Sequence, residues 1–265
     1  MTEKTGMRRS EYRILGITGG VGAGKSTVLS YLKERYGACL LEADRIGHQV
    51  QQPGEPCFDQ IVAAFGKEIL QDGGAIDRRR LGNIVYADRE KMVRLNQIVH
   101  PAVKERIRRE IDRICRENVR NLDETAGIQK KSPAETAGNP KEPFAESKAR
   151  NEICGHRKQA RDTDISVPFV LIVIEAALLL EDHYDEICDE VWYIYADEQT
   201  REERLVQSRG YSREKVRQIL SNQMSEEEFR LRCPVVIDNS GSDLNDTYTQ
   251  IDQALCMLRN AQQDG

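Results

Sequence analysis

The chain lacks a long hydrophobic run. The longest, residues 167–180, is interrupted by Pro168 and Glu175, and it falls short of the ~20 apolar residues that cross a bilayer. The N-terminal residues also lack the apolar stretch of a secretory signal. We therefore expect a cytoplasmic protein that has no membrane partner.

Paired cysteine motifs and an excess of positive charge are missing as well. The seven cysteines are scattered without a C-x-x-C pair, which predicts reduced thiols rather than a zinc site or a disulfide framework. The net charge of −5 over 265 residues argues against nonspecific nucleic-acid binding, because such binding neutralises phosphates with a basic surface. The length fits one or two domains that bury a core of their own.

Apolar runs and helical spacing alternate near the N-terminus. Residues 13–18 are typical of a buried strand, residues 27–35 have helical spacing, and residues 38–42 form a second apolar run. Strand, helix and strand in this order predict a parallel βαβ unit.

The middle of the chain has a helical pattern. Asp88 predicts the start of a helix over residues 89–99, and Pro101 begins another helix. We expect no strand between Asp44 and Pro168, so this stretch predicts a helical subdomain inserted between core strands. Residues from about 117 to 166 carry many charges, three prolines and almost no apolar periodicity, which predicts a mobile hydrophilic insertion.

The core pattern returns in the C-terminal third. Residues 168–174, 191–195 and 234–237 predict three more strands. Short helices are expected between the last two, with Asp197, Ser212 and the capping-box residue Ser225 at their N-termini and Gly210 after the first of them.

A glycine-rich loop joins the first strand to the first helix. Residues 19–26 match the pattern G-x-x-x-x-G-K-[ST], whose glycines let successive backbone N–H groups point at a phosphate. Lys25 can bridge the β- and γ-phosphates, and Ser26 can bind Mg²⁺. The alternative is a chance match in a glycine-rich turn. We predict a site for ATP and Mg²⁺ made by Gly20, Val21, Gly22, Ala23, Gly24, Lys25, Ser26 and Thr27.

Two acidic residues follow predicted strands at the same edge of the sheet. Asp44 follows the second strand, where a carboxylate can accept a proton from an attacking hydroxyl; the alternative is a cap for the next helix. Glu175 follows residues 170–174, where phosphate-loop proteins place an acid that contacts Mg²⁺; the alternative is an ordinary loop residue.

Basic residues are the remaining candidates. Arg204 and Arg209 lie where guanidinium groups can close over a γ-phosphate, or they are solvated residues paired with neighbouring glutamates. The triplet at residues 78–80 lies in the helical part where an acceptor would dock. His100 contacts a ligand or packs at a helix break, and its position before Pro101 favours neither.

Six segments in order resemble the dephospho-CoA kinase family: residues 17–27, 41–48, 74–82, 100–101, 177–181 and 236–239. They are similar to its phosphate loop, its Asp-Ala-Asp segment, its acceptor-binding helical region, its Pro-Leu-Leu-x-Glu loop and its nucleotide-side turn. The resemblance covers roughly residues 12–116 and 167–258.

We expect an α/β fold: a three-layer P-loop NTPase core with a parallel five-stranded sheet, an inserted helical substrate domain and a small helical lid. A single domain would span residues 12–262. Its parts would be a core of 12–44, 167–204 and 233–262, an acceptor-binding subdomain of 45–116, an insertion of 117–166 and a lid of 205–232.

The resemblance also implies roles for single residues. Asp44 would be the general base for the ribose 3′-hydroxyl of dephospho-CoA, Lys25 and Arg204 would act on the transferring phosphate, and Asn239 would lie near adenine. Ser26 and Glu175 would serve the metal. The acceptor contacts would be Asp44, Arg79, His100 and Leu178.

The implied reaction transfers the γ-phosphate of ATP to dephospho-CoA, which is the last step of coenzyme A synthesis. The alternatives are a kinase for a nucleoside or nucleoside monophosphate, or a nucleotide-dependent switch. We expect ATP and dephospho-CoA as small-molecule partners, no nucleic acid, and a monomer or weak homo-oligomer.

This sequence departs from the family pattern at several positions. Glu42 replaces the first Asp of the Asp-Ala-Asp segment, and Ala177 replaces the proline of its loop. Arg209 falls one residue after the place of the second lid arginine, where Ser208 stands. The insertion is absent from the family's short pattern.

Overall fold

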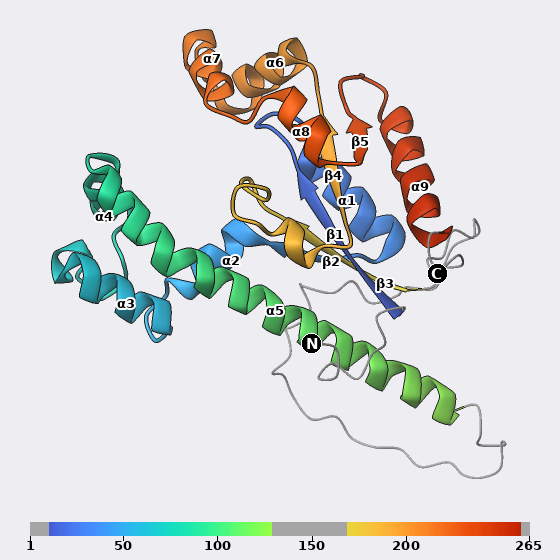
Figure 1. The fold of residues 1–265 in the computed structure, drawn as a ribbon, viewed down its shortest axis with the longest axis horizontal. Helices are drawn as coiled ribbons and strands as arrows, with labels where there is room; N and C mark the ends of the chain where they lie inside the picture. The colour runs from blue at the N-terminus through green and yellow to red at the C-terminus, as the bar shows by residue number, and fades with distance from the viewer. Residues whose placement is uncertain (1–10, 129–168, 261–265) are drawn as a thin grey trace, which may run out of the picture.

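Five parallel strands form the centre of the computed structural model, which describes residues 11–128 and 169–260 (Figure 1). They are β1 (Tyr12–Thr18), β2 (Cys39–Glu42), β3 (Val170–Glu175), β4 (Glu190–Tyr195) and β5 (Val235–Asp238). Their order in the sheet is β2-β3-β1-β4-β5. The predicted α/β class and parallel five-stranded sheet are therefore confirmed, with strand bounds within one residue or two of those expected.

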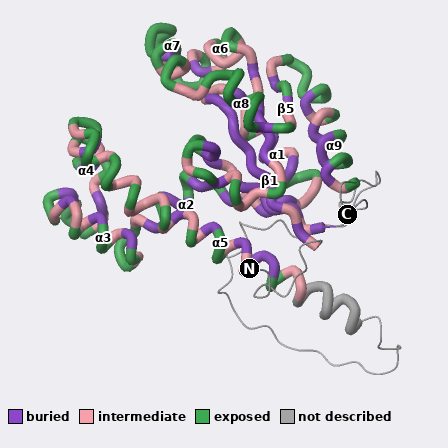
Figure 2. The backbone as a smooth tube through the Cα atoms, in the orientation of Figure 1, coloured by how far each residue is buried: buried purple, intermediate pink, exposed green. Residues whose placement is uncertain are grey.

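The two faces of the sheet carry separate parts of the core. Alternate side chains of a strand point to opposite faces, so Ile14 and Ile172 pack on one side, and Leu15 and Val173 pack on the other. Helices α1 (Lys25–Tyr36) and α9 (Leu244–Asn260) cover the Leu15 side. The inserted helices and α8 (Glu226–Arg232) contribute to the Ile14 side. Figure 2 shows the buried residues concentrated along these contacts.

The inserted helices follow β2 directly. They are α2 (Ala43–Val50), α3 (Pro56–Phe65), the short 3-10 helix η2 (Lys67–Ile69), α4 (Arg78–Tyr86) and α5 (Arg89–Ile128). Helices α3 and α4 lie at one end of α5, away from the sheet (Figure 1). Between Asp44 and Ile128 the structure has no strand, as expected, apart from an isolated bridge between Leu70 and Ile76.

Helix α5 corrects the expectation of two helices separated at Pro101. It is continuous over 40 residues, with Pro101 inside it. A proline costs a helix one hydrogen bond and adds a clash, yet both halves of α5 pack into the core. The buried Val103 and Ile107 follow Pro101 within two turns, and their burial outweighs the local penalty.

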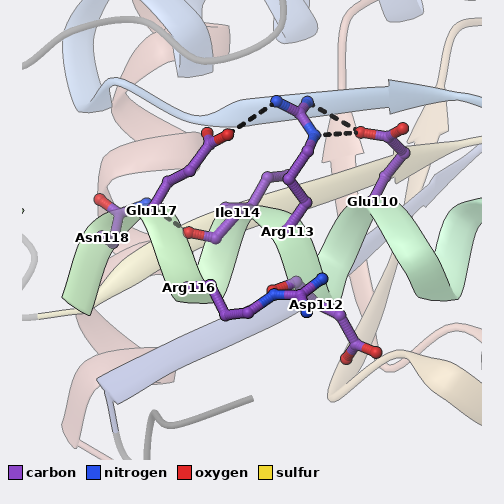
Figure 3. Close-up of polar contacts among 7 residues, drawn as sticks. All are labelled: Glu110, Asp112, Arg113, Ile114, Arg116, Glu117 and Asn118. Atoms are coloured by element: carbon purple, nitrogen blue, oxygen red, sulfur yellow. Dashed lines mark hydrogen bonds and ion pairs between the residues drawn. The ribbon is translucent and has the colours of Figure 1, made fainter. Parts of the chain in front are cut away.

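Helix α5 also runs into the region predicted as an insertion. It extends past residue 117 to Ile128, while residues 129–166 lie outside those described. Before that point, the Arg113 guanidinium lies 2.8 Å from Glu110 Oε2 and 3.0 Å from Glu117 Oε1 (Figure 3). Such i,i+3 and i,i+4 pairs stabilise a helix modestly, so Arg113 has its carboxylate partners within its own helix.

The segment between β4 and β5 folds as the caps predict. Asp197 and Ser212 accept hydrogen bonds at the starts of α6 (Glu198–Arg209) and α7 (Arg213–Ser221). Ser225 and Glu228 form a complete capping box at α8. Gly210 ends α6 with φ of 63°, a conformation that glycine adopts without steric cost. The short 3-10 helix η3 (Asp185–Ile187) precedes β4.

Within residues 11–128 and 169–260, the expectation of reduced thiols is wrong at Cys39. Cys39, at the start of β2, is disulfide-bonded, a pairing that the spacing of cysteines along a sequence cannot reveal. Cys57 and Cys233 are buried free thiols. Burial raises the pKa of both, to about 11 for Cys233, which makes them poor nucleophiles.

No helix within residues 11–128 or 169–260 combines the length and the apolar character that a membrane span requires.

Candidate active site

The candidate residues gather at the carboxyl ends of the strands. In the sheet, β1 has β3 on one side, with β2 beyond it, and β4 on the other side. The connection from β1 to β2 therefore passes β3, and the strand order runs outward from β1 in both directions. Ligands of open parallel sheets bind where the strand order diverges in this way. The glycine loop leaves β1 at this point, Asp44 follows β2 and Glu175 ends β3.

The glycine loop is held by close neighbours. Gly24 has φ of 85° directly before α1, and a Cβ there would overlap Asn239 Nδ2. Asn239 Nδ2 donates to the Ala23 carbonyl oxygen at 2.8 Å, and Thr247 Oγ1 donates to Asn239 Oδ1 at 3.1 Å. Asn239 is 1% exposed. In this structure its amide therefore stabilises the loop, and the position near adenine that the family resemblance implies stays a prediction.

Lys25 lies between the loop and a carboxylate. Its Nζ donates to the Gly19 carbonyl oxygen at 2.8 Å and lies 3.7 Å from Glu175 Oε1. Burial lowers the pKa of Lys25, and the charges of Glu175 and Asp44 oppose that shift. The charges of Lys25, Glu175 and Asp44 therefore interact with one another, although each residue comes from a different part of the chain.

The carboxylates of this site repel one another. Burial raises the pKa of Glu175, the Lys25 charge lowers it, and the charges of Asp44 and Glu42 raise it. Glu42 and Glu175 are register partners in neighbouring strands. A cation near these groups would relieve the repulsion.

A magnesium ion fits the donors at this edge. The Ser26 hydroxyl lies at the exposed start of α1 beside the loop, and Glu175 supplies carboxylate oxygen. In the described part of the chain, no cluster of three or more His, Cys, Asp or Glu side chains could hold a metal alone. Mg²⁺ commonly takes one or two protein ligands and fills its shell with phosphate oxygens and water, which agrees with so sparse a set.

Arg204 reaches the glycine loop from α6. Its Nη2 donates to the Asn239 carbonyl oxygen at 2.8 Å, and its Nη1 lies 3.4 Å from the carbonyl oxygens of Gly22 and Ala23. These bonds join the loop to the turn after β5. Arg209, at the exposed end of α6, lies away from these contacts.

Two residues at the loop were not foreseen. Arg201 and Gln223 both contact Val21. Arg201 lies one helical turn before Arg204, and residues three apart share a helix face, so that spacing was an available signal. Nothing in the local sequence marks Gln223.

The acceptor-side residues lie on α2 and α4. Asp44 is exposed in the first turn of α2, and His48 lies one turn further on the same helix. Arg78 Nη1 lies 3.1 Å from His48 Nε2. Arg80 instead donates to the Leu70 carbonyl oxygen at 2.8 Å. Arg79 has its backbone N–H bonded to Asp77, so Arg78 is the member of the triplet that the structure brings to the helix of Asp44.

Two further residues predicted to contact the acceptor are His100, in α5, and Leu178, in the segment after β3. His100 Nδ1 is 3.0 Å from Asp182 Oδ1, beside a cavity of about 570 Å³ between α5 and the segment after β3. Burial raises the pKa of Asp182, and the charges of His100 and Lys104 oppose the shift. Leu178 is 51% exposed, although Leu179 and Leu180 beside it are buried. A single exposed apolar side chain is common on a protein surface, so the acceptor contact of Leu178 stays a prediction.

A glycine loop between a buried strand and a helix, a lysine inside it, and carboxylates at the ends of the neighbouring strands define a P-loop kinase. The family model described as dephospho-CoA kinase matches residues 13–123 and 152–245. The chain belongs to this family.

Individual relatives agree with this assignment. A dephospho-CoA kinase of Shouchella clausii is 32% identical over 91% of this chain and 96% of its own length. One of Geobacter sulfurreducens is 34% identical over 86% of this chain and 90% of its own. A crystal structure of a Thermus thermophilus protein, 25% identical, superposes with a TM-score of 0.62 over 94% of this chain and 98% of that one.

Proposed function

We propose that the chain transfers the γ-phosphate of ATP to the ribose 3′-hydroxyl of dephospho-CoA, with Asp44 as the general base. One observation carries the proposal: Asp44 lies in the first turn of α2, two residues after Glu42, and Glu42 is the register partner of Glu175, whose carboxylate lies 3.7 Å from Lys25 Nζ. The base and the phosphate-binding lysine therefore lie together, as in-line transfer between two bound substrates requires.

The remaining residues have roles in positioning and charge. The loop N–H groups and the N-terminus of α1 hold the phosphates, and Lys25 neutralises charge on the transferring group. Asp44 accepts the proton of the 3′-hydroxyl as the bond from the 3′-oxygen to the γ-phosphorus forms, and the bond from that phosphorus to the bridging oxygen breaks and releases ADP. Bound Mg²⁺, held by Ser26 and through water by Glu175, would add charge neutralisation at the phosphates. Arg204 steadies the loop and is a candidate for contact with the γ-phosphate.

An ADP-release assay with ATP and Mg²⁺ tests this activity. Dephospho-CoA is compared with adenosine, AMP and no acceptor, and the product is identified by mass. We expect release that depends on dephospho-CoA, together with coenzyme A. Release with adenosine or AMP would support the alternative kinase, whereas slow release that no acceptor stimulates would support a switch.

Two further properties are proposed on the sequence alone. A cytoplasmic location and a monomer or weak homo-oligomer agree with the composition, and light scattering at several concentrations tests the second of them.

Arg78 is expected to matter for the acceptor more than Arg79. A phosphate of the acceptor lies within one sugar of the reacting hydroxyl, and Arg78 contacts His48, which lies one turn from Asp44. Arg78→Ala should raise the KM for dephospho-CoA about tenfold and leave the KM for ATP unchanged, because a charge-assisted bond is lost. Arg79→Ala is the matched control. Equal effects of the two substitutions would contradict this assignment.

A further inference from the structure

Three hydrogen bonds link Arg201, Gln223 and the backbone of Val21 in the phosphate loop to one another. Arg201 Nε donates to the Val21 carbonyl oxygen at 3.0 Å, and the Val21 N–H donates to Gln223 Oε1 at 3.2 Å. Arg201 Nη2 donates to the same Gln223 oxygen. Both backbone polar groups of Val21 are thus fixed by side chains 180 and 202 residues away in sequence.

The two side chains come from different elements. Arg201 lies in the first turn of α6, within the predicted core segment of residues 167–204. Gln223 lies between α7 and α8, within the predicted lid of residues 205–232. Arg201 is partly buried, and burial lowers its pKa. Arginine stays protonated in proteins, so its bond to the Gln223 oxygen is charge-assisted and strong for its type.

The packing of Arg201 and Gln223 against the loop explains why glycine occupies position 20. Gly20 does not have a positive φ, so its backbone conformation is open to other residues. A Cβ at Gly20 would nevertheless overlap the Arg201 guanidinium and lie 2.9 Å from Gln223 Oε1. At Gly22, a Cβ would lie 3.0 Å from the Arg201 carbonyl oxygen. The pair therefore packs directly on the loop, and the loop sequence accommodates it.

We propose that Arg201 and Gln223 are positioning residues that fix the backbone of Val21, and with it the conformation of the phosphate loop, and that they tie the loop to the lid. Gln223 accepts bonds from both Val21 and Arg201, so displacement of α7 and α8 from the loop breaks two of the three bonds. The conformation of the loop then depends on the position of the lid. The inference rests on the proposed function only in assuming that the loop binds ATP.

Binding of ATP and Mg²⁺ without an acceptor tests the inference, so that its outcome does not depend on which acceptor the enzyme uses. Calorimetry would compare wild type, Gln223→Leu, Arg201→Met and the double variant. Each single substitution should weaken ATP binding about tenfold, as expected for loss of a hydrogen bond to a charged group. Because the three bonds form one unit, the double variant should be little weaker than either single one.

Two further measurements separate positioning from general destabilisation. Hydrogen exchange in the peptide that contains Val21 should accelerate in Gln223→Leu, while exchange in β3 stays unchanged. The KM for the acceptor should not change, in contrast to the KM for ATP. Gln218→Leu, at an exposed position of α7, is the matched control and should bind ATP as wild type does.

The inference fails if Gln223→Leu binds ATP within about twofold of wild type, or if the two single effects add in full in the double variant. If Gln223→Leu does not fold, Gln223→Asn replaces it. That variant keeps the amide but draws it back by one methylene, and it should likewise lose ATP affinity and protection at Val21.

Discussion

Asp44→Asn is expected to abolish most phosphoryl transfer and to leave ATP binding intact. The carboxylate lies at the exposed start of α2, where an acceptor hydroxyl can reach it. Asparagine has nearly the same shape but cannot take up the proton. Loss of a general base lowers kcat by about 10²- to 10⁴-fold. ATP affinity should stay equal or rise slightly, because one negative charge near Lys25 disappears.

Single-turnover kinetics and calorimetry check this prediction together. The first isolates the chemical step, and the second measures ATP binding. Asp59→Asn, at an exposed position of α3 in the same subdomain, is the control for a lost surface carboxylate and should retain full activity. An Asp44→Asn enzyme with a nearly normal kcat would remove Asp44 from the role of base.

The parts of the fold that local chemistry determines were predictable from the sequence. The continuous apolar runs of β1 and β3, the caps at Asp197 and Ser212 and the glycine loop all depend on neighbours in sequence. Pro101 was misjudged because its local penalty competes with burial of residues such as Ile107, against elements distant in sequence. Sequence spacing measures the penalty but not the burial.

The same distinction between local pattern and distant contact applies to the candidate site. The sequence predicts that Lys25, Asp44 and Glu175 lie at one edge of the sheet, because each follows or ends a recognisable strand and parallel strands bring their carboxyl ends together. Gln223 was missed because its contact with the loop joins residues 202 positions apart. Asn239 was among the predicted residues, but no motif describes its bonds to Ala23 and Thr247.

Lys25→Met is expected to remove ATP binding and turnover and also to destabilise the fold. The lysine is the nearest described cation to Glu175, at 3.7 Å, and both side chains are mostly buried, with exposures of 16% and 14%. Methionine keeps the volume and removes the charge. Loss of a group that stabilises the transition state commonly lowers kcat by about 10²- to 10³-fold, and phosphate binding also weakens because the cation is gone.

The loss of stability should depend on pH in a defined direction. Without Lys25, burial and the neighbouring carboxylates raise the pKa of Glu175 further. A carboxyl group whose folded-state pKa exceeds its unfolded value stabilises the fold at low pH, and this contribution is lost as the pH rises through the folded pKa. Urea unfolding at about pH 5 and about pH 8 should therefore show a larger deficit at the higher pH, of up to about 3 kcal/mol.

A double variant separates the two effects of Lys25. Glu175→Gln in the Lys25→Met background removes the unpaired carboxylate, so the free energy of unfolding should recover at the higher pH. Turnover should not recover, because the cation that binds the phosphates is still absent and the proposed metal contact of Glu175 is lost too. If the double variant regained ATP binding along with stability, Lys25 would be a structural partner of Glu175 rather than a phosphate ligand.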